Sequence, residues 1–200
     1  MLKNIDSYKN VMFIFDYDGV LGDTWGEMRK AYEFFIGKTL SDQEWLDINR
    51  DYDLHPRKYM DFGEFFASSD VIRSIPPLKG MPELVSTLFY MDAEMCVLTC
   101  IEKEAEQARQ ENLDNFFGGV FSDLHCIGKE SKTSVLSYYD ERYWRTIFID
   151  DSIHYIKESI GIVTHPIWMD VGYLSHRAHE LSDDVYRADS VDALCDLLLS

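Results

Sequence analysis

The sequence predicts an α/β protein with a Rossmann-like, doubly wound parallel sheet and a small helical insertion after the first strand. Short apolar runs typical of strands alternate with segments of helical character, and this order favours a parallel sheet with helices on both faces. Most of these runs are continuously apolar, as expected for strands buried on both faces. One long stretch after the first run breaks the alternation and therefore predicts the insertion.

Five strands and five core helices are expected along the chain. The apolar runs that predict strands are residues 11–15, 95–99, 119–121, 146–149 and 162–168. The segments that predict helices are residues 81–91, 102–113, 130–139, 152–159 and 191–199. Pro82 suits the first turn of the first of these helices, where a missing backbone N–H costs nothing.

Residues 25–76 form the expected insertion, a helical cap. Its first helix has an apolar face that contains Met28, Ala31, Tyr32 and Phe35. Ser41 and Glu44 have the spacing of a capping box before a second helix, and a third helix is expected near residues 59–66. The predicted domains are therefore a core of residues 1–24 and 77–200 and a cap of residues 25–76, with residues 76–80 as the return linker.

Composition limits the possible partners. The 200 residues carry a formal charge of −17, which disfavours nucleic acid and anionic membranes. No run approaches the roughly 18 apolar residues of a membrane span, and the first residues lack the pattern of a secretory signal, so we expect a cytoplasmic chain. The four cysteines lack zinc-ligand spacing and are expected to be reduced structural thiols.

Polar residues follow three of the expected strands. Asp16 and Asp18 follow the first strand, Thr99 ends the second, and Asp150 and Asp151 follow the fourth. Ligands of such sheets bind at the carboxyl ends of the strands, so these side chains are candidates for one site. Taken singly, each has an ordinary alternative, such as a solvated acidic turn, a buried threonine or a helix cap.

The arrangement resembles the haloacid dehalogenase (HAD) superfamily of phosphohydrolases, and in particular the branch with beta-phosphoglucomutase and phosphoglycolate phosphatase. The first motif is an apolar strand followed by Asp16-x-Asp18-Gly19-Val20-Leu21-x-Asp23-Thr24. Leu98-Thr99 resembles the second motif, Lys132 the third, and the segment Phe148-Ile149-Asp150-Asp151-Ser152 the fourth. The resemblance covers residues 11–24 and 77–199.

The resemblance implies a phosphatase that forms an aspartyl-phosphate. Asp16 would attack phosphorus, and Asp18 would act as general acid and then general base. Lys132 would neutralise charge, and Thr99 would donate a hydrogen bond to phosphate. Cys100 would also contact the substrate, although relatives often have Asn there.

The resemblance also implies a magnesium site. Mg²⁺ prefers oxygen ligands, which Asp16, the backbone carbonyl of Asp18, Asp150 and Asp151 would supply. Such a cation would offset the repulsion between these acids and a phosphate ester. Thr133 replaces the proline that frequently follows the lysine, which should alter only how the helix begins.

The substrate stays open at this stage. A small phosphorylated metabolite is the first expectation, and a phosphotyrosine protein is the alternative because the short cap would leave the site open. A phosphomutase, a dehalogenase, a phosphonatase using Lys38 or Lys58, a receiver domain and a silent binding module are weaker alternatives. The sequence does not predict an oligomeric state.

Two groups outside the motifs are possible sites. A basic cluster in the cap could recognise a second anionic group of the substrate or could be a solvated face; it comprises Arg50, His55, Arg57 and Lys58. His176 and His179 have helical spacing, but no third metal ligand is evident.

Overall fold

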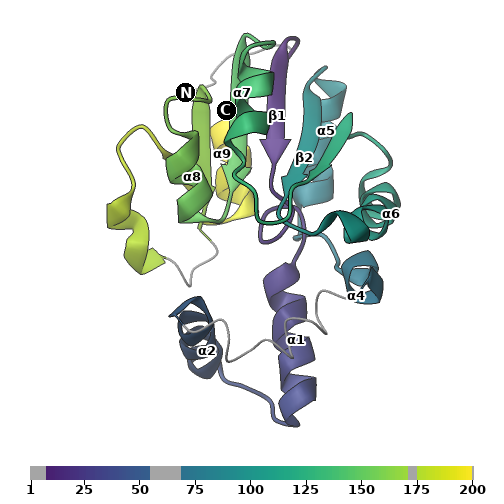
Figure 1. Ribbon diagram of the computed structural model, residues 1–200, viewed down its shortest axis with the longest axis vertical. Helices are drawn as coiled ribbons and strands as arrows, with labels where there is room; N and C mark the ends of the chain where they lie inside the picture. The colour runs from purple at the N-terminus through teal and green to yellow at the C-terminus, as the bar shows by residue number, and fades with distance from the viewer. Residues whose placement is uncertain (1–7, 55–68, 171–174, 200) are drawn as a thin grey trace.

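Six parallel strands form the centre of the protein. The computed structural model describes residues 8–54, 69–170 and 175–199, and in it the strands lie in the order β3-β2-β1-β4-β5-β6 (Figure 1). The strands are β1 (Val11–Phe15), β2 (Glu94–Thr99), β3 (Asp123–Cys126), β4 (Arg145–Asp150), β5 (His165–Met169) and β6 (Tyr186–Ala188). All five strand pairs are parallel, which confirms the predicted fold class.

Strand β1 lies in the middle of the sheet and is buried along its whole length. It pairs with β2 on one side and β4 on the other, so Ile14 lies opposite both Cys96 and Phe148. The strand order therefore runs outward from β1 in both directions, through β2 to β3 on one side and through β4 to β6 on the other. Ligands of open α/β sheets bind at this kind of switch point. The carboxyl ends of β1, β2 and β4 meet there.

Helices cover both faces of the sheet. On one face α5 (Met81–Tyr90), α6 (Glu106–Phe117) and α9 (Val191–Leu199) pack against the strands. On the other face lie α7 (Thr133–Asp140) and α8 (Ile153–Ser159). Two short 3₁₀ helices, η2 (Lys103–Ala105) and η3 (Ser175–Glu180), complete the described core. Each face thus has its own apolar cluster, and alternate residues of β1 belong to each.

The strand predicted at residues 119–121 is wrong. Gly118 and Gly119 both have positive φ, at 70° and 72°, and they end α6 and reverse the chain. Val120 and Phe121 pack against the core from a loop, and the next residues, Asp123–Cys126, pair with β2 as β3. Because β3 is an edge strand, it is only partly buried and its sequence is more polar than a central strand.

Other differences are at element ends. Strand β5 begins at His165, three residues after the predicted start, and the short edge strand β6 was not predicted. Helix α6 follows the 3₁₀ turn η2 and ends at Phe117, beyond the predicted residue 113. Helix α7 starts just after Lys132, which precedes it as the N-cap residue.

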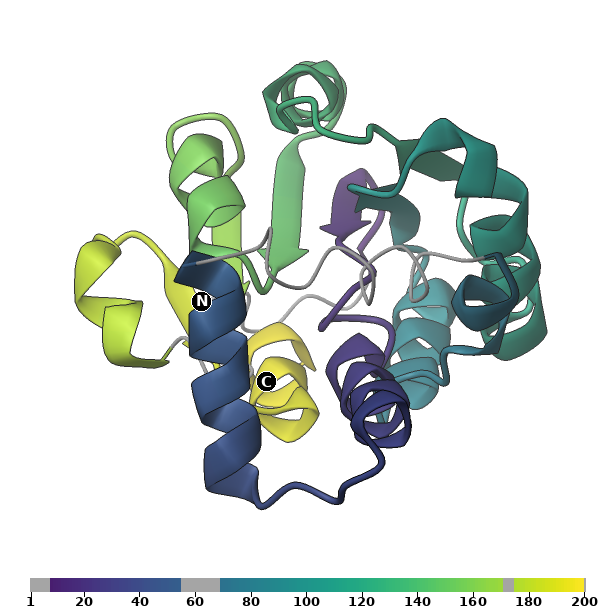
Figure 2. The same cartoon turned by 60° about the horizontal axis from the view of Figure 1, so that its bottom comes forward.

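The segment between β1 and α5 contains α1 (Thr24–Ile36), α2 (Asp42–Leu54) and α4 (Ser69–Ser74). The capping box is confirmed, because the N–H of Glu44 donates to the Ser41 hydroxyl and the N–H of Ser41 donates to the Glu44 carboxylate. Helices α1 and α2 lie beyond the carboxyl ends of the strands, and Figure 2 brings this edge of the sheet forward. The helix predicted near residues 59–66 lies outside the described residues.

Among the described helices, none combines the length and apolar character required to cross a bilayer.

Candidate active site

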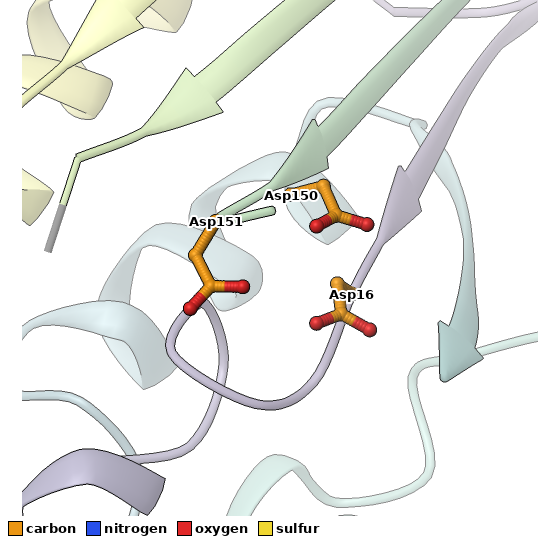
Figure 3. A group of neighbouring side chains, drawn as sticks. All are labelled: Asp16, Asp150 and Asp151. Carbon is orange, nitrogen blue, oxygen red and sulfur yellow. The ribbon is translucent and has the colours of Figure 1, made fainter. Parts of the chain in front are cut away.

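Three aspartates converge where β1 and β4 end. Asp16 follows β1, Asp150 is the last residue of β4, and Asp151 follows it (Figure 3). One carboxylate oxygen from each lies within 4.8 Å of the others, and all three residues are buried. Parallel pairing produces this convergence, because Phe15 is in register with Ile149 and the N–H of Asp16 donates to the Ile149 carbonyl. The structure thus brings together three of the four acids that the sequence predicted for the site.

Lys132 joins two of these acids. Its Nζ donates to Oδ1 of Asp16 at 2.8 Å and to Oδ2 of Asp150 at 2.7 Å. The Lys132 side chain is 1% exposed, and Nζ also lies 4.7 Å from the ring centroid of Tyr155. The N–H of Ser152 donates to the other oxygen of Asp150 at 2.7 Å. Each oxygen of Asp150 therefore accepts one hydrogen bond, and Asp150 holds the ammonium group beside Asp16.

The cluster has more negative than positive charge. Burial raises the pKa of Asp16 to about 7, and repulsion from Asp150 and Asp18 adds to this while Lys132 opposes it. Burial also raises the pKa of Asp151 well above its ordinary value, with further contributions from Asp150 and Asp16. For Lys132, burial lowers the pKa, but Asp150 and Asp16 outweigh it and the net pKa is raised. Lys132 therefore stays charged, whereas ionised aspartates here are unfavourable without a further cation.

The Asp18 carboxylate has different hydrogen-bond partners. The Thr24 hydroxyl donates to its Oδ1 at 2.7 Å, and Nη2 of Arg109 donates to the same oxygen at 3.1 Å. Arg109 comes from α6, its side chain is 1% exposed, and its guanidinium carbon lies 3.3 Å from the centroid of the Tyr17 ring. The Tyr17 hydroxyl in turn donates to Asn112, also on α6, at 2.5 Å. Asp18 thus accepts hydrogen bonds both from a residue of helix α6 and from the first residue of α1.

Arg109 was not predicted as a site residue. Its sequence position suggests one more charge on a polar helix, but Arg109 and Asn112 fall on the buried side of α6 with Ala108 and Leu113. A charged residue on the apolar stripe of a helix was the available signal. Its Nε and Nη1 are buried and have no hydrogen-bond partner among the described residues.

Thr99 is the last residue of β2, and Cys100 follows it. Thr99 is fully buried, and its hydroxyl has no hydrogen-bond partner in the described part of the chain. Burial raises the pKa of Cys100 to about 11, with Lys132 opposing this effect. Cys100 is therefore a neutral thiol at physiological pH. The unpartnered hydroxyl of Thr99 is a donor suited to an anionic ligand, because a buried polar atom without a hydrogen bond costs about 1–3 kcal/mol.

The three aspartates fit a hard divalent cation. All candidate ligand atoms are carboxylate oxygens, which suit Mg²⁺ or Ca²⁺ better than softer metals. Asp16 and Asp151 each have one oxygen in a hydrogen bond, to Lys132 and to Trp25, and the second oxygen has none among the described residues. Two carboxylate oxygens therefore remain for a cation.

The weaker candidates do not join this site. Within residues 8–54, 69–170 and 175–199, the three aspartates are the only group with metal-ligand geometry, and His179 belongs to no such group. Lys38 forms an ion pair with Glu44 at 2.5 Å, and Arg50 lies 3.9 Å from Asp47. His55, Arg57 and Lys58, together with the side chain of His176, lie outside the described residues.

Comparisons with known proteins support the fold. No protein-family model matches the sequence, and the search of curated proteins finds no match. A HAD-superfamily hydrolase of subfamily IA from Geobacter sulfurreducens is 16% identical, with a TM-score of 0.60 over 96% of this chain and 98% of that chain.

Two further structures were solved with ligands. YfnB from Bacillus subtilis, solved bound to magnesium, is 14% identical, with a TM-score of 0.61 over 96% of this chain and 99% of that chain. A mutant of CbbY from Rhodobacter sphaeroides, solved with xylulose-(1,5)bisphosphate, is 15% identical, with a TM-score of 0.56 over 90% of this chain and 93% of that chain. At this identity the likeness shows the fold alone: this chain shares the α/β fold of these hydrolases, the fold that the resemblance in its sequence implied.

Proposed function

We propose that this protein is a Mg²⁺-dependent phosphomonoester hydrolase that works through an aspartyl-phosphate on Asp16. The observation that carries the proposal is the ion pair between Asp16 and Lys132, at 2.8 Å, beside two further carboxylates at the switch point of the sheet. A nucleophilic carboxylate, a fixed positive charge and a cation site are the groups that phosphoryl transfer requires, because its catalysis is mainly alignment and charge neutralisation.

The proposed cation ligands are Asp16, Asp151 and the backbone oxygen of Asp18. Asp150 is the remaining acid of the site and lies beside them. When bound there, Mg²⁺ would neutralise charge on the carboxylates and on the phosphate oxygens. The contacts of Asp150 with Lys132 and Ser152 favour a role in holding Lys132 as well.

The reaction has two steps. First, a carboxylate oxygen of Asp16 forms a bond to phosphorus while the bond from phosphorus to the leaving oxygen breaks, and Asp18 gives that oxygen a proton. Then water attacks the aspartyl-phosphate and passes a proton to Asp18, and inorganic phosphate leaves as the Asp16 carboxylate is restored. Asp18 returns to its starting state, so the proton balance closes over one turnover.

Lys132 and Thr99 hold the phosphoryl group in this proposal. The buried ammonium of Lys132 offsets charge on Asp16 and on the transferred oxygens. The Thr99 hydroxyl donates to a phosphate oxygen and thereby gains its missing partner. Cys100 lies next in the chain and would contribute shape rather than charge, because it is a neutral thiol.

We propose residues 25–76 as a cap over a core of residues 1–24 and 77–200, and a small phosphorylated metabolite as the substrate. The position of α1 and α2 beyond the strand ends supports the cap (Figure 2). The bisphosphate bound to the CbbY mutant, which shares this fold, supports a phosphorylated small molecule. We place the reaction in the cytoplasm, as expected from the sequence.

The test is phosphate release from a panel of small phosphomonoesters, nucleotides and phosphotyrosine peptides, with Mg²⁺ or with EDTA. We expect Mg²⁺-dependent release that is lost in Asp16→Asn and retained in Asp183→Asn, an equal charge change at an exposed residue. Borohydride reduction after rapid quenching should mark Asp16 in the wild-type protein, since it reduces acyl phosphates. Release that persists in Asp16→Asn would exclude the proposed intermediate, and preference for the peptides would replace the metabolite with a protein substrate.

A further inference from the structure

We propose that Trp25 is a positioning residue for the cation site and that it ties the affinity for Mg²⁺ to the start of helix α1. The inference rests on the proposed function, because it concerns the same aspartates. It adds a residue of the inserted segment that acts through Asp151 and does not itself bind the cation.

The contact is a hydrogen bond to a proposed cation ligand. Nε1 of Trp25 donates to Oδ2 of Asp151 at 2.9 Å. Nε1 of Trp168, on β5, donates to the backbone carbonyl of Asp151, also at 2.9 Å. Two indoles therefore fix both the main chain and the side chain of Asp151. Oδ2 is held by Trp25, and Oδ1 has no hydrogen bond from the described residues.

Gly19 leaves room for this contact. A Cβ at position 19 would lie 2.3 Å from Oδ2 of Asp151 and 2.6 Å from Nε1 of Trp25, which is too close for any side chain. Gly19 also has a φ of 76°, which a residue with a Cβ adopts at a cost. The turn after β1 thus has both the shape and the space that the hydrogen bond requires.

Trp25 belongs to the inserted segment, whereas Asp151 belongs to the core. The preceding residue, Thr24, begins α1 and donates to Asp18 at 2.7 Å. The first two residues of α1 therefore contact two different aspartates of the site. A displacement of α1 would lengthen the indole hydrogen bond and release the Asp151 carboxylate. Outer-shell hydrogen bonds of this kind orient metal ligands, and their loss commonly weakens metal binding by about 10- to 100-fold.

The test compares Mg²⁺ binding by calorimetry in the wild-type protein and in Trp25→Phe, which keeps an aromatic ring but removes the N–H. The matched control is Trp144→Phe, because Trp144 is 66% exposed and stacks on Arg145 instead. We expect the Kd for Mg²⁺ to rise about tenfold in Trp25→Phe and to stay unchanged in the control. The thermal midpoint in EDTA should be similar in all three, which separates positioning from a purely structural role.

A Kd in Trp25→Phe within about twofold of wild type would overturn the inference and leave the proposed function standing. A wild-type protein that binds no Mg²⁺ would overturn both. If Trp25→Phe does not fold, ¹⁵N-labelled tryptophan in the wild-type protein provides the second measurement. The indole resonance of Trp25 should move as Mg²⁺ saturates the site, while that of Trp144 should not, and an unmoved Trp25 resonance would refute the role.

Discussion

Replacing Asp16 by Asn should abolish activity and yet make the protein more stable when no divalent cation is present. Asp16 is 6% exposed and shares its surroundings with Asp150 and Asp151. Asn has the same shape as Asp but no charge, so it removes one of three crowded carboxylates. The change thus tests whether the buried, crowded carboxylates destabilise the folded protein when no cation is bound.

The magnitude follows from the pKa of Asp16. Burial raises it from an ordinary value of 3.8 to about 7. Between these two values the folded protein binds more protons than the unfolded chain, so its stability falls as the pH rises through this window. At 1.36 kcal/mol for each pKa unit, we expect the wild-type protein to lose about 4 kcal/mol of stability by pH 7 and Asp16→Asn to recover about 2–4 kcal/mol of it.

Urea unfolding in EDTA, followed by circular dichroism from about pH 4.5 to about pH 8, measures this difference. The difference in the free energy of unfolding between Asp16→Asn and wild type should be small at the acidic end and largest above pH 7. Asp183→Asn should follow the wild-type curve. Adding Mg²⁺ should stabilise the wild type and narrow the gap, by about 2.7 kcal/mol at a concentration 100 times the Kd. An Asp16→Asn protein no more stable than wild type at high pH would refute the reasoning.

Three further substitutions test other contacts of the site. Lys132→Met should cost about 3–5 kcal/mol in urea unfolding above pH 7, because it leaves buried carboxylates without their cation, and a loss that does not shrink at acidic pH would contradict this cause. Thr99→Val should leave stability unchanged or raise it by about 1–3 kcal/mol while weakening competitive inhibition by phosphate, and a clear loss of stability would mean that the hydroxyl has a partner. Arg109→Lys should lower kcat about tenfold with a smaller change in KM, since a lysine cannot both stack and reach Asp18; an unchanged kcat would exclude a positioning role.

Central elements could be predicted from the sequence because burial on both faces makes a strand uniformly apolar. Strand β1 matches the predicted residues 11–15, and β4 differs only at its ends. Edge strands lack this signal: β3 reads Asp-Leu-His-Cys and β6 has only three residues. The strand was predicted instead at the apolar residues Val120 and Phe121, although two glycines place them in a loop.

The candidate site was predictable to the extent that it depends on strand ends. Residues at the carboxyl ends of neighbouring parallel strands must lie close together, so the convergence of Asp16 with Asp150 and Asp151 follows from the topology. Contacts from helices depend on packing instead. Arg109 lies 91 positions from its partner Asp18, and Trp25 lies 126 positions from Asp151, and no local pattern links either pair. Such pairs become visible only when the helices are placed on the sheet.

The charge balance of the site also predicts that Mg²⁺ binds before phosphate. Asp16, Asp150 and Asp151 provide three negative charges when ionised, and Lys132 provides one positive charge within hydrogen-bond distance. The remaining negative charge repels a phosphate ester, as does the whole chain at −17. A divalent cation would cancel this excess, so phosphate should bind weakly to the protein in EDTA and more tightly once Mg²⁺ is present. Calorimetry with inorganic phosphate and Asp16→Asn above pH 7, where Asp16 is ionised, would separate the two contributions, because removal of one negative charge should strengthen phosphate binding in EDTA even though turnover is lost.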